Sequence, residues 1–174
     1  MLDLINFYDD FFDNSVHHKI NNICMDKKFK YGELDDSSKS TIPTGVTCNF
    51  DMNDELYKIM VPKISSIIHN NLTITRSYIN LFSPGEKPNC HRDSENIGDI
   101  TVLYYPNLDP WNPNDNGETL FYDEIKNITY GIAPVPNRLV IFPANLLHSA
   151  SSMRNKWRYS IAFKFKIINS FLDI

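Results

Sequence analysis

From residue 72 onward, the chain is a series of short segments rich in β-branched and aromatic residues, separated by clusters of Gly, Pro and Asn. The segments are "LTITRSYINLF", "DITVLYYPN", "ETLFYD", "ITYGIAPV", "NRLVIFPA" and "RYSIAFKFKII". Short strands at this spacing are typical of an antiparallel sandwich or barrel. We find no repeat and no alternation of strands with helices. The pattern therefore predicts a mainly β fold, with a sandwich of about eight strands in residues 72–174.

The first 71 residues differ in pattern, and we expect them to form a helical layer on the β core of a single domain, 1–174. A first helix is predicted within residues 6–24, where apolar residues recur near helical spacing at Phe7, Phe11, Phe12, Val16 and Ile20. The polar segment "GELDDSSKSTIPTG" (32–45) is interpreted as a loop.

A second helix is predicted to start near "DMNDEL", with Asp51 or Asn53 as its N-cap. Pro62 lies inside this helix. Its apolar face would consist of Leu56, Ile59, Met60, Ile64 and Ile67.

Composition narrows the range of partners and locations. The net charge of −4 disfavours a nucleic-acid surface, because phosphate contacts need clustered Lys and Arg. No apolar run approaches the roughly 20 residues that span a bilayer, and the acidic N-terminal segment does not resemble a signal peptide. Three widely spaced cysteines fit neither a disulfide framework nor a zinc motif. We expect a cytoplasmic protein without membrane or nucleic-acid partners; the sequence does not indicate its oligomeric state.

The segment "NCHRDSENIGD" (89–99) contains the most suggestive polar pair, His91 and Asp93. Residues i and i+2 of an extended segment lie on the same face, so the imidazole and the carboxylate can bind one ion. An Fe(II) site with open positions uses two histidines and one carboxylate. His148, which follows the strand-like segment "RLVIFPAN", can supply the second imidazole. Taken alone, however, a His-x-Asp pair is more often a solvated polar turn.

Ten residues after His148, Arg158 and Ser160 share one face of a predicted strand. Beside a metal, a guanidinium and a hydroxyl form a suitable clamp for a dicarboxylate. The alternative is an ordinary surface arginine next to Trp157.

Residues 76–165 resemble the Fe(II)- and 2-oxoglutarate-dependent dioxygenases, most of all their prolyl 4-hydroxylase-like branch. The matching stretches are "HRDS", "TVLYYPNLDPWNPNDNGETLFYD", "PNRLVIFPANLLHS" and "WRYSIAFKF". The resemblance implies a double-stranded β-helix of the jelly-roll or cupin type. It also implies Fe(II), 2-oxoglutarate and O2 as cofactor and co-substrates, and it is compatible with ascorbate.

By the same resemblance, His91, Asp93 and His148 are the iron ligands and the catalytic residues. Arg158 binds the distal carboxylate of 2-oxoglutarate, with the hydroxyl of Tyr105 assisting.

The chain departs from the branch before the His-x-Asp pair, where "FSPG" places Phe82 at a position often held by tyrosine. Tyr78 and Asn80 lie on the same strand face and can replace the missing hydroxyl. Ser160 forms an Arg-x-Ser pair that is more typical of oxygenases acting on small molecules. The expected reaction is hydroxylation of a C–H bond in a prolyl residue or a small proline-like molecule, with succinate and CO2 as co-products.

Two other functions remain open at this point. One is a non-catalytic cupin-like module that binds or senses a ligand in the same place. The other is a metal-dependent cupin hydrolase or isomerase, which would not need Arg158.

Overall fold

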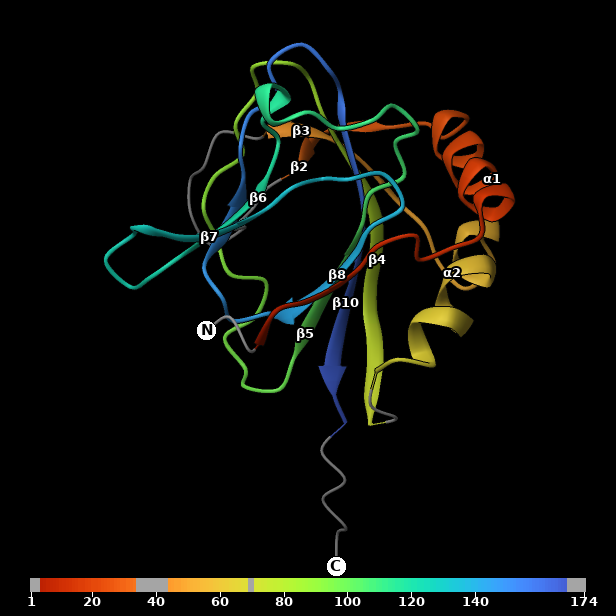
Figure 1. Cartoon of the computed structure of the whole chain (residues 1–174). Helices are drawn as coiled ribbons and strands as arrows, with labels where there is room; N and C mark the ends of the chain where they lie inside the picture. Colours follow the sequence, from red (N-terminus) through yellow and green to blue (C-terminus); the bar gives the residue numbers. More distant parts are fainter. Residues whose placement is uncertain (1–3, 34–43, 69–70, 169–174) are drawn as a thin grey trace, which may run out of the picture.

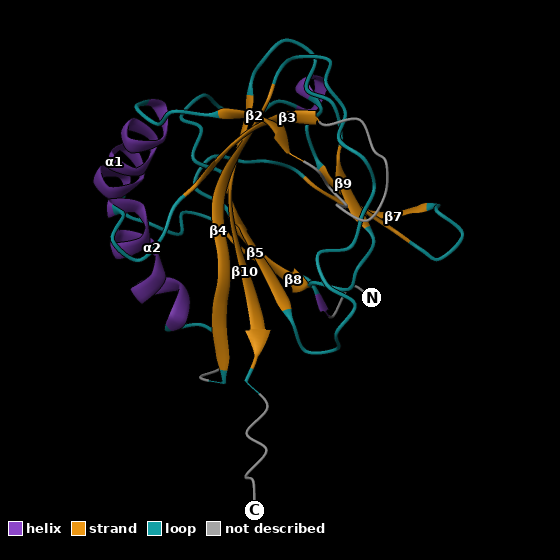
Figure 2. Cartoon of the chain, turned by 180° about the vertical axis from the view of Figure 1, so that it is seen from behind, coloured by secondary structure: helices purple, strands orange, loops and turns teal. Residues whose placement is uncertain are grey.

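The computed structural model describes residues 4–33, 44–68 and 71–168, which form three layers. Two helices cover the outer face of a seven-stranded sheet, and a three-stranded sheet lies against its other face (Figures 1 and 2). All strand pairs are antiparallel. The predicted mainly β jelly-roll architecture is therefore confirmed.

The large sheet has the strand order β1-β8-β5-β10-β4-β3-β2, and the small sheet has the order β7-β6-β9. The strands of the large sheet are β1 (Asn6–Tyr8), β2 (Lys30–Glu33), β3 (Thr44–Asn49), β4 (Leu72–Phe82), β5 (Ile100–Tyr104), β8 (Leu139–Pro143) and β10 (Arg158–Ile167). Those of the small sheet are β6 (Thr119–Tyr122), β7 (Ile128–Ile132) and β9 (His148–Ala150).

Alternation along β10, a central strand, separates an apolar core from a polar interior. Ile161 and Phe163 point toward the helices and are fully buried in the core between the helices and the sheet. Arg158 and Ser160, at alternate positions, point to the other face. Because β10 pairs with both β4 and β5, the side chains on this inner face are held in a fixed register between the two sheets.

The helices are α1 (Asn14–Met25) and α2 (Glu55–Ser65), which pack side by side on the outer face (Figure 1). In α2 the Asp54 carboxylate accepts a hydrogen bond from the Leu56 backbone N–H at 3.0 Å and so caps the helix. Pro62 lies inside α2, as expected. The buried face of α2 consists of Leu56, Met60 and Ile64.

The N-terminal third differs from the expected helical layer, because it also contributes β1, β2 and β3 to the large sheet. The first helix begins only at Asn14, since residues 6–8 pair with β8 instead. The second helix is capped by Asp54, so the predictions of Asp51 and Asn53 are wrong. Most of the predicted loop 32–45 lies outside the described residues. Short strands such as these, at or next to an edge of the sheet, depend on pairing with another strand, and their own sequences carry little signal.

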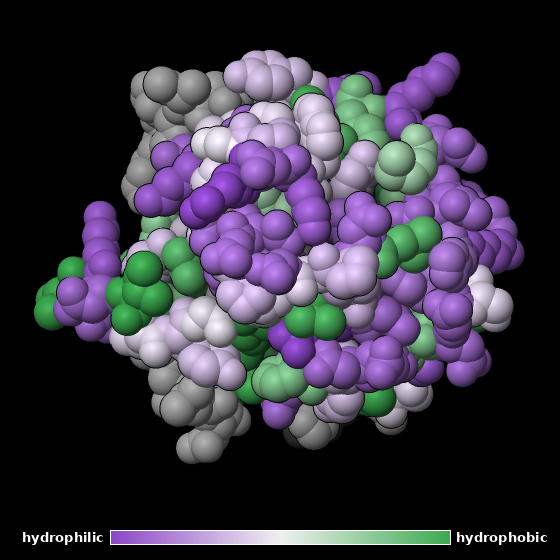
Figure 3. All heavy atoms as spheres, turned by 45° about the horizontal axis from the view of Figure 1, so that its top comes forward, coloured by the Kyte–Doolittle hydropathy of each residue, from purple (hydrophilic) through white to green (hydrophobic). Residues whose placement is uncertain are grey.

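The described helices are all too short or too polar to cross a membrane. On the face that Figure 3 shows, hydrophobic residues are scattered among hydrophilic ones and do not form a single patch. Among the exposed apolar side chains are Ile125, 80% exposed, in the protruding β6–β7 hairpin, and Trp157, 52% exposed, just before β10.

Candidate metal centre

A turn between β4 and β5 carries His91 and Asp93 into the space between the two sheets, where it meets β9. His91 and His148 form an isolated antiparallel bridge, in which each backbone N–H donates to the other's carbonyl at 2.9 Å. The Asp93 N–H donates to the carbonyl of Ala144, also at 2.9 Å. Backbone hydrogen bonds therefore fix all three predicted ligands relative to one another.

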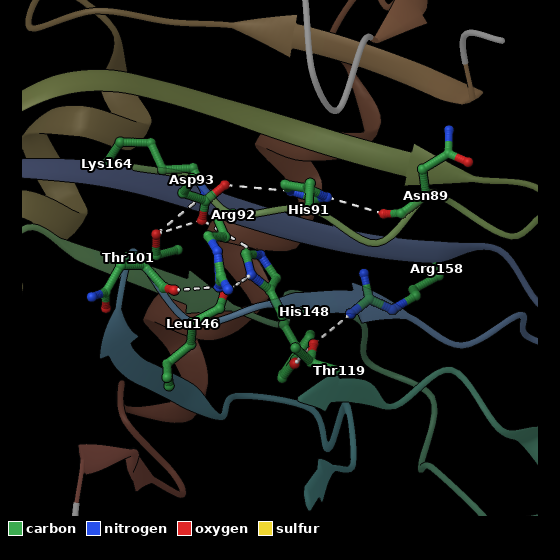
Figure 4. A network of polar contacts seen from close by, with 12 residues as sticks. Asn89, His91, Arg92, Asp93, Thr101, Thr119, Leu146, His148, Arg158 and Lys164 are labelled. Carbon is green, nitrogen blue, oxygen red and sulfur yellow. Dashed lines mark hydrogen bonds and ion pairs between the residues drawn. The ribbon is translucent and has the colours of Figure 1, made fainter. Parts of the chain in front are cut away.

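The side chains of these residues converge (Figure 4). One ligand atom each from His91, Asp93 and His148 lies within 4.8 Å of the others. His91 Nε2 is 3.4 Å from Asp93 Oδ1, and His148 Nε2 is 3.5 Å from Asp93 Oδ2. Of the other histidines, His17 and His18 lie in α1, and His69 lies outside the described residues.

Hydrogen bonds set the tautomers of both imidazoles. His91 Nδ1 donates to the Asn89 carbonyl at 3.0 Å, and His148 Nδ1 donates to the Leu146 carbonyl at 2.9 Å. The proton therefore sits on Nδ1 in each ring, and the Nε2 lone pair is directed at the shared centre. Burial lowers the pKa of His148 to about 4, although Asp93 partly opposes this shift. The imidazole is thus neutral near pH 7, as metal ligation requires.

The Asp93 carboxylate is ionised. Burial would raise its pKa, but the positive charge of Lys164, together with interactions with His148 and His91, holds the pKa well below its usual value. Thr101 donates to Oδ2 at 2.5 Å, and Lys164 also donates to Oδ2. Arg92, between the two ligands in sequence, points away, and its Nη2 donates to both carboxylate oxygens of Glu124.

Arg158 lies on the same interior face, with only 4% of its surface exposed. Its guanidinium donates to the Gly117 carbonyl at 2.8 Å, to Thr119 Oγ1 at 2.9 Å and to Ser160 Oγ at 3.3 Å. The hydroxyl of Tyr105 completes the group by bonding to Thr119 Oγ1 at 2.7 Å. The structure thus brings together three of the residues predicted for co-substrate binding, and it rules out the alternative of a surface arginine.

The other two predicted residues are on β4. Asn80 pairs across the sheet with Ser160, and its Oδ1 is buried without a hydrogen-bond partner in the described part of the chain. Tyr78 lies beside Lys164, with the centre of its ring 5.6 Å from Lys164 Nζ. Phe82 offers no hydroxyl, and its ring packs so closely on Gly45 that a Cβ there would lie 2.7 Å from it.

Sequence reasoning missed Thr119, Thr101 and Lys164. Lys164 had a usable signal, because it lies an even number of positions after Arg158 in the same strand and therefore on the same interior face. The loop 107–117 contains Trp111, whose indole N–H donates to the Asn116 carbonyl at 2.8 Å and so anchors the loop.

The donors present suit a ferrous ion and an anionic ligand. Two imidazoles and one carboxylate on one side of a centre form the facial set that leaves other positions open. Arg158 suits an anionic ligand, because no carboxylate among the described residues lies within ion-pair distance of this buried cation. A buried charge without a counter-ion is costly unless a ligand compensates for it.

Sequence comparison identifies the class of protein that this fold and centre define. The profile of the 2OG-Fe(II) oxygenase superfamily matches residues 76–166, a little over half of the chain. The chain therefore belongs to the 2OG-Fe(II) oxygenase superfamily, whose members use Fe(II), 2-oxoglutarate and O2. Among curated proteins, no sequence matches it significantly.

Solved structures of the same fold include several prolyl hydroxylases. A prolyl hydroxylase from Trichoplax adhaerens, in complex with a peptide fragment of the hypoxia inducible factor oxygen degradation domain, aligns with a TM-score of 0.71 and 20% identity; the alignment covers 92% of this chain and 82% of that one. For a Pseudomonas putida prolyl-4-hydroxylase, the TM-score is 0.72 at 15% identity, with 93% and 92% covered. For the viral collagen prolyl hydroxylase of Paramecium Bursaria Chlorella virus-1, bound to 2OG, it is 0.68 at 13% identity, with 93% and 95% covered.

Proposed function

We propose that the protein hydroxylates a C–H bond in a prolyl residue or a small proline-like molecule, with succinate and CO2 as co-products. The observation that carries this proposal is the buried guanidinium of Arg158, which forms no ion pair among the described residues and lies in the same interior as the triad of His91, Asp93 and His148. A metal centre alone would serve many reactions, whereas a buried cation beside it selects for a co-substrate with a distal carboxylate.

In the proposed arrangement, the triad binds Fe(II) through the two Nε2 atoms and the Asp93 carboxylate. When bound, Fe(II), 2-oxoglutarate and O2 together supply the oxidant for the C–H bond. Arg158 binds the distal carboxylate of 2-oxoglutarate through donors that its protein contacts leave unused, because those contacts take three of its five N–H groups. Tyr105 and Ser160 keep the guanidinium and its neighbour Thr119 in place.

We further propose that Asn80 binds the co-substrate from β4. Its Oδ1 is buried and unpaired, and such an atom is costly unless a ligand or a water molecule donates to it. It lies directly across from Ser160 in the sheet, next to the clamp. For Tyr78 we infer a role nearer the metal, since its ring lies beside Lys164, which contacts Asp93.

The similarity to prolyl hydroxylases supports the substrate class, because three structures of that name share the fold over more than nine tenths of this chain. A peptide substrate is also compatible with the exposed side chain of Trp157, which immediately precedes Arg158 in the chain. The experiment is incubation with proline-rich peptides and with free proline, followed by mass spectrometry for the gain of one oxygen atom. It distinguishes a peptide hydroxylase from an enzyme that hydroxylates small molecules.

Anaerobic titration with Fe(II) and 2-oxoglutarate tests the chemistry. Chelation of the keto acid by ferrous iron produces a visible charge-transfer band, which we expect for the wild-type protein. Addition of O2 should then yield succinate.

The variant Asp93→Ala should lose nearly all succinate formation, because the centre would lack its only anionic ligand. Glu95→Ala, a change at an exposed acid two residues away, is the matched control and should behave as wild type. Wild-type rates of succinate release in Asp93→Ala would contradict the ligand assignment. A metal-bound but inert wild-type protein would favour a binding module instead.

A further inference from the structure

Lys164 is a partly buried lysine whose ammonium group lies beside the candidate metal centre. It is in β10, on the inner face that also carries Arg158, and its side chain is 16% exposed. In Figure 4 it reaches Asp93 from the side of the triad opposite to Arg158. Its Nζ donates to Asp93 Oδ2, lies 3.4 Å from Thr101 Oγ1 and is 5.6 Å from the centre of the Tyr78 ring.

The two oxygens of Asp93 are treated differently by their surroundings. Oδ2 accepts from both Lys164 and Thr101, which uses the two lone pairs that a carboxylate oxygen offers. Each oxygen lies near one imidazole, Oδ1 at 3.4 Å from His91 Nε2 and Oδ2 at 3.5 Å from His148 Nε2. Oδ1 accepts no hydrogen bond from Lys164 or Thr101, so it keeps lone pairs for a metal, whereas Oδ2 has both of its lone pairs engaged by the protein.

We propose that Lys164 is a positioning residue, which together with Thr101 holds Oδ2 so that Asp93 binds the metal through Oδ1 alone. This inference rests on the proposed function, in which Asp93 is a metal ligand. Lys164 itself contacts neither metal nor co-substrate in this arrangement and acts only through the carboxylate.

The number of bound oxygens matters for an octahedral metal. With one oxygen from Asp93, the triad uses three positions and leaves three, enough for a chelating keto acid and one further ligand. With both oxygens bound, that further position would be lost. Lys164 also balances the charge of a carboxylate whose side chain is only 6% exposed, so the site keeps its shape before any metal arrives.

Cobalt(II) binding tests this role without relying on turnover, because the visible d–d bands of Co(II) depend on coordination number and geometry. In Lys164→Met the dissociation constant for Co(II) should rise about 10- to 100-fold, the usual effect of removing a partner of a metal ligand, and the d–d bands should change. Thr101→Val, which is nearly isosteric, should change both quantities in the same direction. Lys166→Met, an exposed lysine of the same strand, is the matched control and should match wild type.

Several outcomes would overturn the inference. Co(II) affinity within about threefold of wild type, together with unchanged bands in folded Lys164→Met, would reduce Lys164 to a structural role. Tighter binding would show that its charge repels the metal and does not position Asp93. If Lys164→Met does not fold by circular dichroism, Thr101→Val decides, since unchanged binding there means that holding Oδ2 is unimportant. Failure of the wild-type protein to bind Co(II) would instead refute the proposed metal site.

Discussion

The contacts of Arg158 allow the cost of losing its proposed clamp on 2-oxoglutarate to be estimated. The change is Arg158→Gln, which keeps a neutral amide group but removes the charge and the planar fork. The wild-type side chain spends three donors on Gly117, Thr119 and Ser160 and so has up to two for a carboxylate. Each hydrogen bond to a charged group contributes about 1.5–3 kcal/mol, so the pair contributes roughly 3–6 kcal/mol. The affinity for 2-oxoglutarate should fall by about 10²- to 10⁴-fold.

The assay is anaerobic titration of the Fe(II)-loaded protein, followed through the charge-transfer band. A second titration uses 2-oxopentanoate, which has a methyl group in place of the distal carboxylate but chelates iron in the same way. Arg158→Gln should weaken binding of 2-oxoglutarate and leave that of 2-oxopentanoate within about threefold, because only the former meets the guanidinium. Arg154→Gln, an exposed arginine ahead of β10, is the matched control.

Two results would refute this reasoning. An equal loss of affinity for both keto acids would mean that the substitution disturbs the fold or the metal site, because 2-oxopentanoate has no distal carboxylate for Arg158 to bind. Unchanged affinity for 2-oxoglutarate would mean that its distal end binds elsewhere.

Two further predictions concern stability. Burial lowers the pKa of His17 in the folded protein. Below about pH 6.5 the unfolded chain therefore binds a proton at His17 that the folded chain does not bind. The free energy of unfolding should fall on acidification by up to about 1.4 kcal/mol per pH unit. Urea unfolding between pH 7 and pH 5 should show a smaller loss for His17→Gln than for wild type; parallel curves would disprove the assignment. Gly117→Ala combines a positive φ of 90° with a Cβ only 2.5 Å from Met153 Cγ, whereas Gly85, with φ of 83°, faces open space. The melting temperature should therefore fall further for Gly117→Ala than for Gly85→Ala, and equal losses would show that Met153 yields without cost.

The β core could be predicted from the sequence because its strands carry their own signal. The predicted segment 72–82 coincides with β4, and five others contain β5, β6, β7, β8 and β10. In contrast, β9 has only three residues and follows a turn, so neither period nor length distinguishes it from a loop. The same is true of β1, which is exposed throughout and gains its partner from β8, far along the chain.

The residues of the candidate centre likewise differ in how far the sequence predicts them. His91, Asp93 and His148 were predictable because ligands must be of particular types, and Arg158 because alternation placed it on an inner face. The structure brings all four to the same interior. Their roles as ligands and clamp remain predictions for the titrations above. The contacts of Thr101 and Lys164 with one carboxylate oxygen depend on the register of β5 against β10, which pairs Thr101 with Lys164 and which no local pattern encodes.

The reciprocal backbone pair between His91 and His148 also has a kinetic consequence. The backbone pair holds the two main chains together, and each ring is held in place by the hydrogen bond from its Nδ1 to a backbone carbonyl. An ion held by both rings would then leave most readily through a local opening that separates the turn from β9. Its residence time would be set by the frequency of that opening, and the amide hydrogens of His91 and His148 would exchange with solvent in the same event.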